Sequence, residues 1–197
     1  MKILFAFASY LVGSIPTGYL LVRLTARKDI RQFGSRSMGA TNVLRVKGWR
    51  AALPVAAIDV LKGFLPALFA LKYSGDPVFA AFCAFLSVVG HCFPFSIGFR
   101  GGKGVATSLG AYVAIACLPL MACLGFFFIV IAVSRYVSLG SLVGSLAFPF
   151  LVLLSGGPKG VFVISLAIAV LVTFQHRDNI GRLVKGKTVA LKLNLTG

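Results

Sequence analysis

Residues 105–134 read VATSLGAYVAIACLPLMACLGFFFIVIAVS, a run of 30 residues without a charged side chain. As one helix this run would be about 45 Å long, whereas the hydrocarbon core of a bilayer is only about 30 Å thick. Gly110, Pro119 and Gly125 fall within the run and could divide it. The run is therefore one tilted span or two short ones, and this choice decides the topology of the whole chain.

The composition favours lipid over water as the solvent of this run. Of the 197 residues 58% are hydrophobic and 12% are charged, whereas soluble domains have about 45–50% apolar residues. Five further apolar runs are candidate spans, namely residues 3–22, 51–71, 77–99, 136–158 and the shorter 160–175. No cleavage site follows the first of them, so we expect it to be retained. The sequence predicts an all-α, polytopic transmembrane helical bundle in one membrane-integral domain over residues 1–197.

Positive charge is gathered between the apolar runs. The chain has 20 Lys and Arg against four acidic residues, all Asp, which gives a net charge of +16. Eight basic residues lie within residues 23–50 and five within 177–192, and shorter loops hold Arg100 with Lys103, and Arg135. The positive-inside rule places such loops in the cytoplasm.

Arg100 and Arg135 share one side of the membrane only if residues 105–134 cross it twice. Two crossings give about seven spans, with the N-terminus outside and the C-terminus cytoplasmic. The competing count is six, which would put Arg135 or the basic tail on the wrong side.

The same charge distribution excludes several classes of function. The basic residues interrupt apolar runs instead of covering a soluble surface, so anionic lipids and small phosphorylated ligands are better partners than nucleic acid. The four cysteines fall in apolar segments and form no CxxC motif. His91 and His176 stand far apart without a carboxylate cluster, so we expect no metal site and no cofactor.

The first basic loop, residues 29–45, reads DIRQFGSRSMGATNVLR. Its glycines and small hydroxyls allow backbone N–H groups to converge on an anion, and Arg36 and Arg45 could bind a phosphate through two hydrogen bonds each. The alternative is a flexible basic loop that lies on anionic lipid.

The second basic loop, residues 98–107, reads GFRGGKGVAT and precedes an expected helix. Such a position favours phosphate because the helix dipole attracts anions. The loop is not a Walker A motif, since Ile97 and Gly104 stand where that motif needs Gly and Ser or Thr. The alternative is a basic turn between two spans.

Four other sites, one pair and three single residues, each have a structural and a functional interpretation. Asp59 and Lys62 lie on one helix face, either as a structural ion pair or as a cavity wall with Lys62 directed at a bound phosphate. Arg135 could be an ordinary anchor at the membrane interface. The position of His176 beside Arg177 and Asn179 favours a functional role for this residue. For His91 we favour packing or a hydrogen bond to the backbone.

In their order and spacing these motifs resemble the bacterial acyl-phosphate:glycerol-3-phosphate acyltransferases along nearly the whole chain. The matching fragments are Gly13-Ser14-Ile15-Pro16, Gly34-Ser35, Gly39-Ala40-Thr41-Asn42 with Arg45, Asp59-Val60-Leu61-Lys62-Gly63, Gly90-His91, Phe93-Pro94, Gly101-Gly102-Lys103-Gly104-Val105-Ala106-Thr107, Arg135-Tyr136-Val137-Ser138-Leu139, His176-Arg177 and Asn179-Ile180. The resemblance implies an enzyme of the bacterial inner membrane whose active site faces the cytoplasm. It implies transfer of a fatty acyl group from acyl phosphate to the 1-hydroxyl of glycerol 3-phosphate, giving lysophosphatidic acid and phosphate.

The resemblance and the loops together give a set of expected site residues. The expected catalytic residues are Ser35, Lys103, Ser138, His176 and Asn179. The expected substrate-binding residues are Arg45, Thr41, Asn42, Lys62, Gly101, Gly102, Gly104 and Arg135. The expected partners are glycerol 3-phosphate, fatty acyl phosphate and membrane lipids, with no metal.

The chain departs from that family's pattern at two places. Arg36-Ser37 stands where Gly-Asn is usual, and Lys187-Thr188 follows Gly186 where a Glu is common. The HxxxxD pattern of other glycerolipid acyltransferases is absent, because Ser96 and Gly181 occupy the aspartate position after the two histidines. The alternative function is a small membrane transporter of an organic phosphate, which would suit the broken run and the charges within spans.

Overall fold

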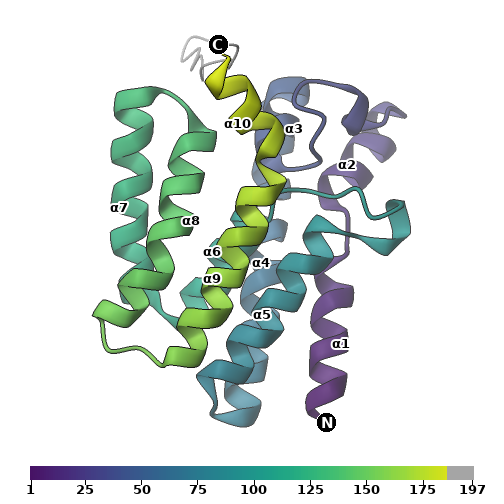
Figure 1. The fold of residues 1–197 in the computed structure, drawn as a ribbon. Helices are drawn as coiled ribbons and strands as arrows, with labels where there is room; N and C mark the ends of the chain where they lie inside the picture. The colour runs from purple at the N-terminus through teal and green to yellow at the C-terminus, as the bar shows by residue number, and fades with distance from the viewer. Residues whose placement is uncertain (186–197) are drawn as a thin grey trace. The chain divides into compact units, whose positions relative to one another are not determined.

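The computed structural model describes residues 1–185, and the chain divides into two compact units, Met1–Cys117 and Leu118–Gly197. The described part of each unit is helical, without strands (Figure 1). The first unit contains α1 (Lys2–Gly13), α2 (Thr17–Ala26), η1 (Ile30–Gln32), α3 (Ala40–Lys47), α4 (Trp49–Ser74), α5 (Pro77–Cys92), η2 (Phe95–Ile97) and α6 (Val105–Ile115). The second contains α7 (Cys117–Ser134), α8 (Val137–Leu154), α9 (Lys159–Gln175) and α10 (Arg177–Val184).

The uncharged run at residues 105–134 forms two helices, α6 and α7. They are separated at Ala116, whose φ of −154° and ψ of 71° are not helical. Pro119 explains the position of the break, because a proline ring clashes with the carbonyl four residues earlier, here that of Ile115 at the end of α6. Gly110 and Gly125 lie inside helices and interrupt neither.

The other predicted runs also correspond to helices. The first run is divided into α1 and α2 next to Pro16, and the two helices together form one candidate span over Lys2–Ala26. Five segments of the described chain are long and apolar enough to cross a membrane, and the pair α9 and α10, bent by 58°, gives up to six. The 11 residues of α6 make a helix of only about 16 Å. The count of seven spans and the sidedness of the termini stay predictions.

The helices of the first unit pack through glycines. A Cβ at Gly63 of α4 would overlap the carbonyl of Thr107 in α6, and one at Gly110 would overlap the carbonyl of Val60. On the other side of the unit, a Cβ at Gly13 of α1 would overlap the carbonyl of Ser87 in α5. Small residues at crossings let membrane helices approach closely. The first residues of α6 therefore lie beside the middle of α4.

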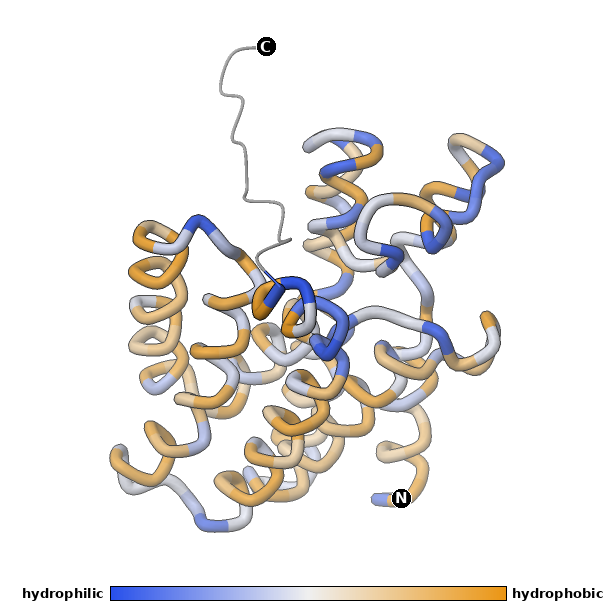
Figure 2. Tube along the Cα trace, turned by 45° about the horizontal axis from the view of Figure 1, so that its top comes forward, coloured by the Kyte–Doolittle hydropathy of each residue, from blue (hydrophilic) through white to orange (hydrophobic). Residues whose placement is uncertain are grey.

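The two basic loops of the first unit lie against each other. Arg31 Nη1 donates to the carbonyl of Ile97, at 2.9 Å. Ile97 also packs against a buried cluster formed by Val22, Ile30, Met38, Val43, Ala52 and Val55. Figure 2 shows that hydrophobic residues follow the long helices, while hydrophilic residues gather in loops and at helix ends.

In the second unit, α8 and α9 pack as an antiparallel hairpin joined by residues 155–158. The start of α8 and the end of α9 therefore lie at the same end of the hairpin. This arrangement places Ser138 and His176 at one end of the second unit.

Candidate active site

Asn42 organises the first basic loop. This residue is 1% exposed, and its side-chain amide donates to the carbonyls of Ile30, Phe33 and Ser37 at 3.3, 3.0 and 2.7 Å. Its Oδ1 accepts from the backbone N–H of Ser35, at 2.8 Å. These bonds hold the loop in its fold, and the role of Asn42 as a substrate ligand stays a prediction.

Ser35 is held between two residues in the left-handed region of backbone space. Gly34 has a φ of 57°, and a Cβ there would also overlap Asn42 Oδ1, so a glycine is required. Arg36 has a φ of 60°, which strains a residue that carries a Cβ by about 1–2 kcal/mol. The half-buried Ser35 side chain is thus presented by a tight, preformed turn.

Thr41 and Arg45 lie one turn apart on the exposed face of α3. They are free of the packing that occupies Asn42, and both belong to the expected substrate-binding set. Their positions suit contact with a ligand that approaches the loop from solvent.

Asp29 and Arg31 fix the start of the same loop. Asp29 caps η1 by accepting from the Arg31 backbone N–H at 2.9 Å, and its carboxylate pairs with Arg31 Nη2 at 2.8 Å. The hydrogen bond from the Arg31 side chain lowers the pKa of Asp29, although partial burial opposes this shift. The sequence offered a signal for this pair in the Asp29-Ile30-Arg31 spacing, but its link to Ile97 could not be predicted.

Gly101 and Gly102 attach the second basic loop to the end of α5. Their N–H groups donate to the carbonyls of Cys92 and His91, at 3.1 and 3.0 Å. A Cβ at Gly101 would overlap these two carbonyls, and a Cβ at Gly102 would overlap the His91 ring. Both amides are bonded within the protein, and the substrate-binding role of Gly101 and Gly102 stays a prediction.

Lys103 and Gly104 lead directly into α6. Gly104, with a φ of 84°, occupies the N-cap position, and Lys103 before it is half-buried. The first N–H groups of a helix have no carbonyl one turn earlier to bond, and they carry the positive end of the helix dipole. An anion site at this point would combine those amides with the Lys103 ammonium.

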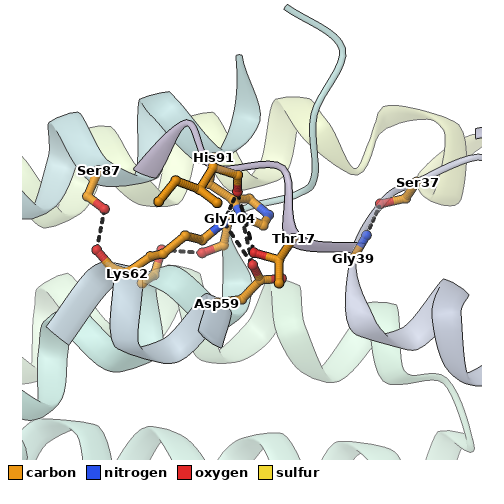
Figure 3. A network of polar contacts seen from close by, with 10 residues as sticks. Thr17, Ser37, Gly39, Asp59, Lys62, Ser87, His91 and Gly104 are labelled. Atoms are coloured by element: carbon orange, nitrogen blue, oxygen red, sulfur yellow. Dashed lines mark hydrogen bonds and ion pairs between the residues drawn. The ribbon is translucent and has the colours of Figure 1, made fainter. Parts of the chain in front are cut away.

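Lys62 lies in a buried polar network. It is 3% exposed, and its Nζ lies 2.8 Å from Asp59 Oδ1, 2.8 Å from the Ile15 carbonyl and 3.1 Å from His91 Nδ1 (Figure 3). The ammonium donates hydrogen bonds to the Ile15 carbonyl and to His91 Nδ1, and it forms an ion pair with Asp59. The geometry favours the structural ion pair over the cavity wall, and the contact between Lys62 and substrate stays a prediction.

The second unit holds the remaining expected residues. Ser138 lies in the first turn of α8 and is half-buried, and Arg135 is exposed at the end of α7, with a φ of 62°. His176 is 2% exposed at the junction of α9 and α10, and its Nδ1 lies 2.8 Å from the carbonyl of Val172. Asn179 Oδ1 accepts from Arg182 Nη2, at 3.0 Å.

The contact of His176 determines which ring nitrogen carries the proton. A carbonyl oxygen only accepts, so Nδ1 is the protonated nitrogen. In the neutral ring the basic lone pair is then on Nε2. Within residues 1–185, no three His, Cys, Asp or Glu side chains are grouped so as to hold a metal ion.

Known proteins resemble the chain over nearly its full length. The sequence model of the glycerol-3-phosphate acyltransferase family matches residues 3–186. The chain belongs to this family. A family member from Thermoanaerobacter pseudethanolicus is 43% identical over 93% of this chain and 92% of its own. Another, from Prochlorococcus marinus strain MIT 9215, is 40% identical over 98% of this chain and all of its own length.

Two solved structures of the family share the fold. Both are crystal structures of PlsY (YgiH), an integral membrane glycerol 3-phosphate acyltransferase. The glycerol 3-phosphate form is 35% identical, with a TM-score of 0.93 over 96% of this chain and 95% of that one. The lysophosphatidic acid form has 34% identity and a TM-score of 0.89 over 96% and 94%. The chain is accordingly a multi-pass membrane acyltransferase, as the sequence predicted.

The family also clarifies one departure from its usual pattern. Arg36, where the resemblance led us to expect Gly, has the left-handed backbone that Gly adopts without strain. The turn is therefore kept despite the substitution. The second departure, at Lys187 and Thr188, lies outside the described residues.

Proposed function

We propose that the chain transfers a fatty acyl group from acyl phosphate to the 1-hydroxyl of glycerol 3-phosphate. The products are lysophosphatidic acid and inorganic phosphate, and the reaction is the first acylation of phospholipid synthesis. Membership of the acyltransferase family favours this function over the transport of an organic phosphate. The proposal places the enzyme in the bacterial inner membrane, with its active site on the cytoplasmic side.

One observation carries the proposal furthest, namely the position of Lys103 at the start of α6. There a lysine immediately precedes the N-cap of a helix whose first N–H groups have no partner within the helix, a combination that favours a phosphate. The loop with Ser35, Thr41 and Arg45 is attached to the same end of the unit by the contact of Arg31 with Ile97. A reaction between two phosphate-bearing substrates needs more than one anion-binding group, and these loops supply them.

The proposed chemistry needs no covalent enzyme intermediate. The glycerol hydroxyl oxygen attacks the acyl carbonyl carbon, an ester bond forms, and the bond to the phosphate oxygen breaks with its electron pair leaving on phosphate. We assign to Lys103 and the first amides of α6 the neutralisation of phosphate and developing negative charge. Arg45 and Thr41 hold a substrate phosphate, and Ser35 and Ser138 orient the reacting groups.

The hydroxyl proton needs an acceptor. We assign this role to Nε2 of His176, whose lone pair follows from the contact of Nδ1 with Val172. Asn179, whose Oδ1 accepts from Arg182, and Arg135 are further candidates that the resemblance implies. A phosphate oxygen of the substrate is the other candidate base, since acidic residues are scarce.

The test is an assay of purified protein in lipid nanodiscs with palmitoyl phosphate and radiolabelled glycerol 3-phosphate. We expect labelled lysophosphatidic acid, formed together with one phosphate per acyl group. Lys103→Ala should lower kcat/KM by about 10²–10³-fold while keeping the unfolding temperature. Lys103→Arg, which keeps the charge, is the matched control and should lose less.

Different outcomes would contradict different parts of the proposal. Product formed from palmitoyl-CoA but not from palmitoyl phosphate would reject the donor. No product from either donor, together with uptake of glycerol 3-phosphate into vesicles, would support the transporter instead. A pH–rate profile that His176→Gln leaves unchanged would exclude the histidine as the base.

A further inference from the structure

Three charged or titratable side chains form a buried network in the first unit (Figure 3). Asp59 and Lys62 belong to α4 and His91 belongs to α5, and all three are at most 3% exposed. Asp59 Oδ1 lies 2.8 Å from Lys62 Nζ and 3.6 Å from His91 Nδ1. Ionised groups within a span are expensive, so a network at this depth calls for a function.

The network determines the tautomer of His91. An ammonium can only donate, so Lys62 Nζ donates to His91 Nδ1, across 3.1 Å. The ring is therefore neutral, and its hydrogen is on Nε2. Lys62 also donates to the carbonyl of Ile15, at 2.8 Å, in the break between α1 and α2. The ring is thus fixed from one side by a group that is itself held by two others.

The other edge of the ring faces the loop that carries Lys103. A Cβ at Gly102 would overlap Nε2, Cδ2 and Cε1 of His91, and these ring atoms are its nearest obstacles. The φ of Gly102 lies outside the left-handed region, so the backbone itself would accept an alanine. The ring therefore determines how close the Gly102 backbone lies to α5, one residue before Lys103.

We propose that His91 is a positioning residue for Lys103. The Asp59–Lys62 pair holds the ring in one orientation, and the Nε2 edge of the ring packs against Gly102. The loop then presents the Lys103 ammonium and the start of α6 at a fixed distance from substrate phosphate. His91 acts through the loop and does not touch the substrate. This inference rests on the proposed function, because its main readout is acyl transfer.

A double-mutant cycle between His91 and Gly102 tests the proposal. Gly102→Ala should raise KM for glycerol 3-phosphate by about tenfold, because the new methyl group pushes the loop away from the ring. His91→Asn keeps an acceptor for Lys62 but removes the Nε2 edge, and should raise KM by a similar factor. Since Asn leaves room for the methyl group, the double variant should have a KM no higher than that of Gly102→Ala alone.

Gly101 provides the matched control. A Cβ there would overlap the backbone carbonyls of His91 and Cys92, and these stay in place when the ring is removed. The effects of Gly101→Ala and His91→Asn on KM should therefore multiply. Ser87→Ala is the second control, because the Ser87 hydroxyl donates to the Lys62 carbonyl at 2.6 Å, away from the loop. It should lower the unfolding temperature and leave KM unchanged.

His91→Gln separates positioning from simple packing. Its side-chain amide can place an N–H where Nε2 lies, so KM should return towards the wild-type value although the contact with Lys62 is weakened. If the effects of Gly102→Ala and His91→Asn multiply as those of the Gly101 control do, the proposal is wrong. It is also wrong if the His91 variants change kcat alone. Absence of lysophosphatidic acid with the wild-type enzyme would instead reject the proposed function, and coupling between residues 91 and 102 could then still be measured in thermal unfolding.

Discussion

The side-chain amide of Asn42 bonds to the backbone of the loop that carries Ser35, a residue of the expected site. We expect Asn42→Ala to lower the free energy of unfolding by about 3 kcal/mol, because it leaves three buried or part-buried carbonyls and the Ser35 N–H without this partner. Thr41→Ala, at the exposed neighbouring position, should change stability by less than about 0.5 kcal/mol. Thermal unfolding in detergent measures both variants. Intact stability with a raised KM in Asn42→Ala would support Asn42 as a substrate ligand.

Asp29 gives the protein a predictable response to acid. Its pKa is lowered in the folded protein, chiefly by the hydrogen bond from Arg31, so its carboxylate stabilises the fold above the unfolded pKa of about 4. That contribution is lost as the pH falls through the lower, folded pKa. We expect the difference in unfolding temperature between wild type and Asp29→Asn to be constant at pH 5–7 and to shrink below about pH 4. A difference that grows on acidification would show that the carboxylate is unfavourable in the fold.

Asn42 and Asp29 show that the sequence can predict which residues gather in a loop, but not which of them contact the protein's own backbone. The loop composition predicted anion binding, and Ser35, Thr41, Arg45 and Lys103 remain placed for it. An amide such as that of Asn42 can bind a phosphate or a carbonyl equally well. Which of these it meets depends on the path of residues 30–37, and no local pattern determines that path. The same applies to Lys62, whose partners outside α4 come from α5 and from the break between α1 and α2.

Helix breaks lie next to Pro16 and Pro119, and only the second was named from the sequence as a possible break. Pro54 and Pro66 nevertheless lie inside α4 without dividing it. Proline removes one hydrogen bond at each position, and neighbouring helices can compensate for that loss in a membrane protein. The sequence therefore indicated where helices could end, and packing decided where they did.

Glycines at helix crossings should behave differently from glycines that face open space. Gly63→Ala should destabilise the protein by about 1–3 kcal/mol, since its methyl group would meet the backbone of Thr107 and force α4 and α6 apart. A methyl group at Gly125, inside α7, would meet no atom of another described helix within 4 Å, and Gly125→Ala should stabilise by about 0.5–1 kcal/mol. Opposite signs in thermal unfolding support the crossing. Equal effects would show that α4 and α6 can separate freely.

At the scale of the whole molecule, the number of crossings stays a prediction. Arg100 and Arg135 should lie on the same side of the membrane if residues 105–134 cross twice, and on opposite sides if they cross once. Single-cysteine variants Arg100→Cys and Arg135→Cys, in a chain without its four native cysteines, can be labelled with an impermeant maleimide in oriented vesicles. We expect both to react only from the cytoplasmic face. Labelling from opposite faces would support six spans.

The beginning of α6 beside the middle of α4 has a consequence for ionic strength. Gly102 lies against His91, which contacts Lys62, and Lys62 is 13 residues, or about 20 Å, along α4 from Trp49. Lys103, the residue after Gly102, is half-buried, and dissolved ions screen a partly buried charge less than a charge at the surface. Raising NaCl from about 50 to 500 mM should therefore change KM for glycerol 3-phosphate by less than about twofold. A steep rise in KM would mean that exposed arginines such as Arg45 dominate the capture of the substrate.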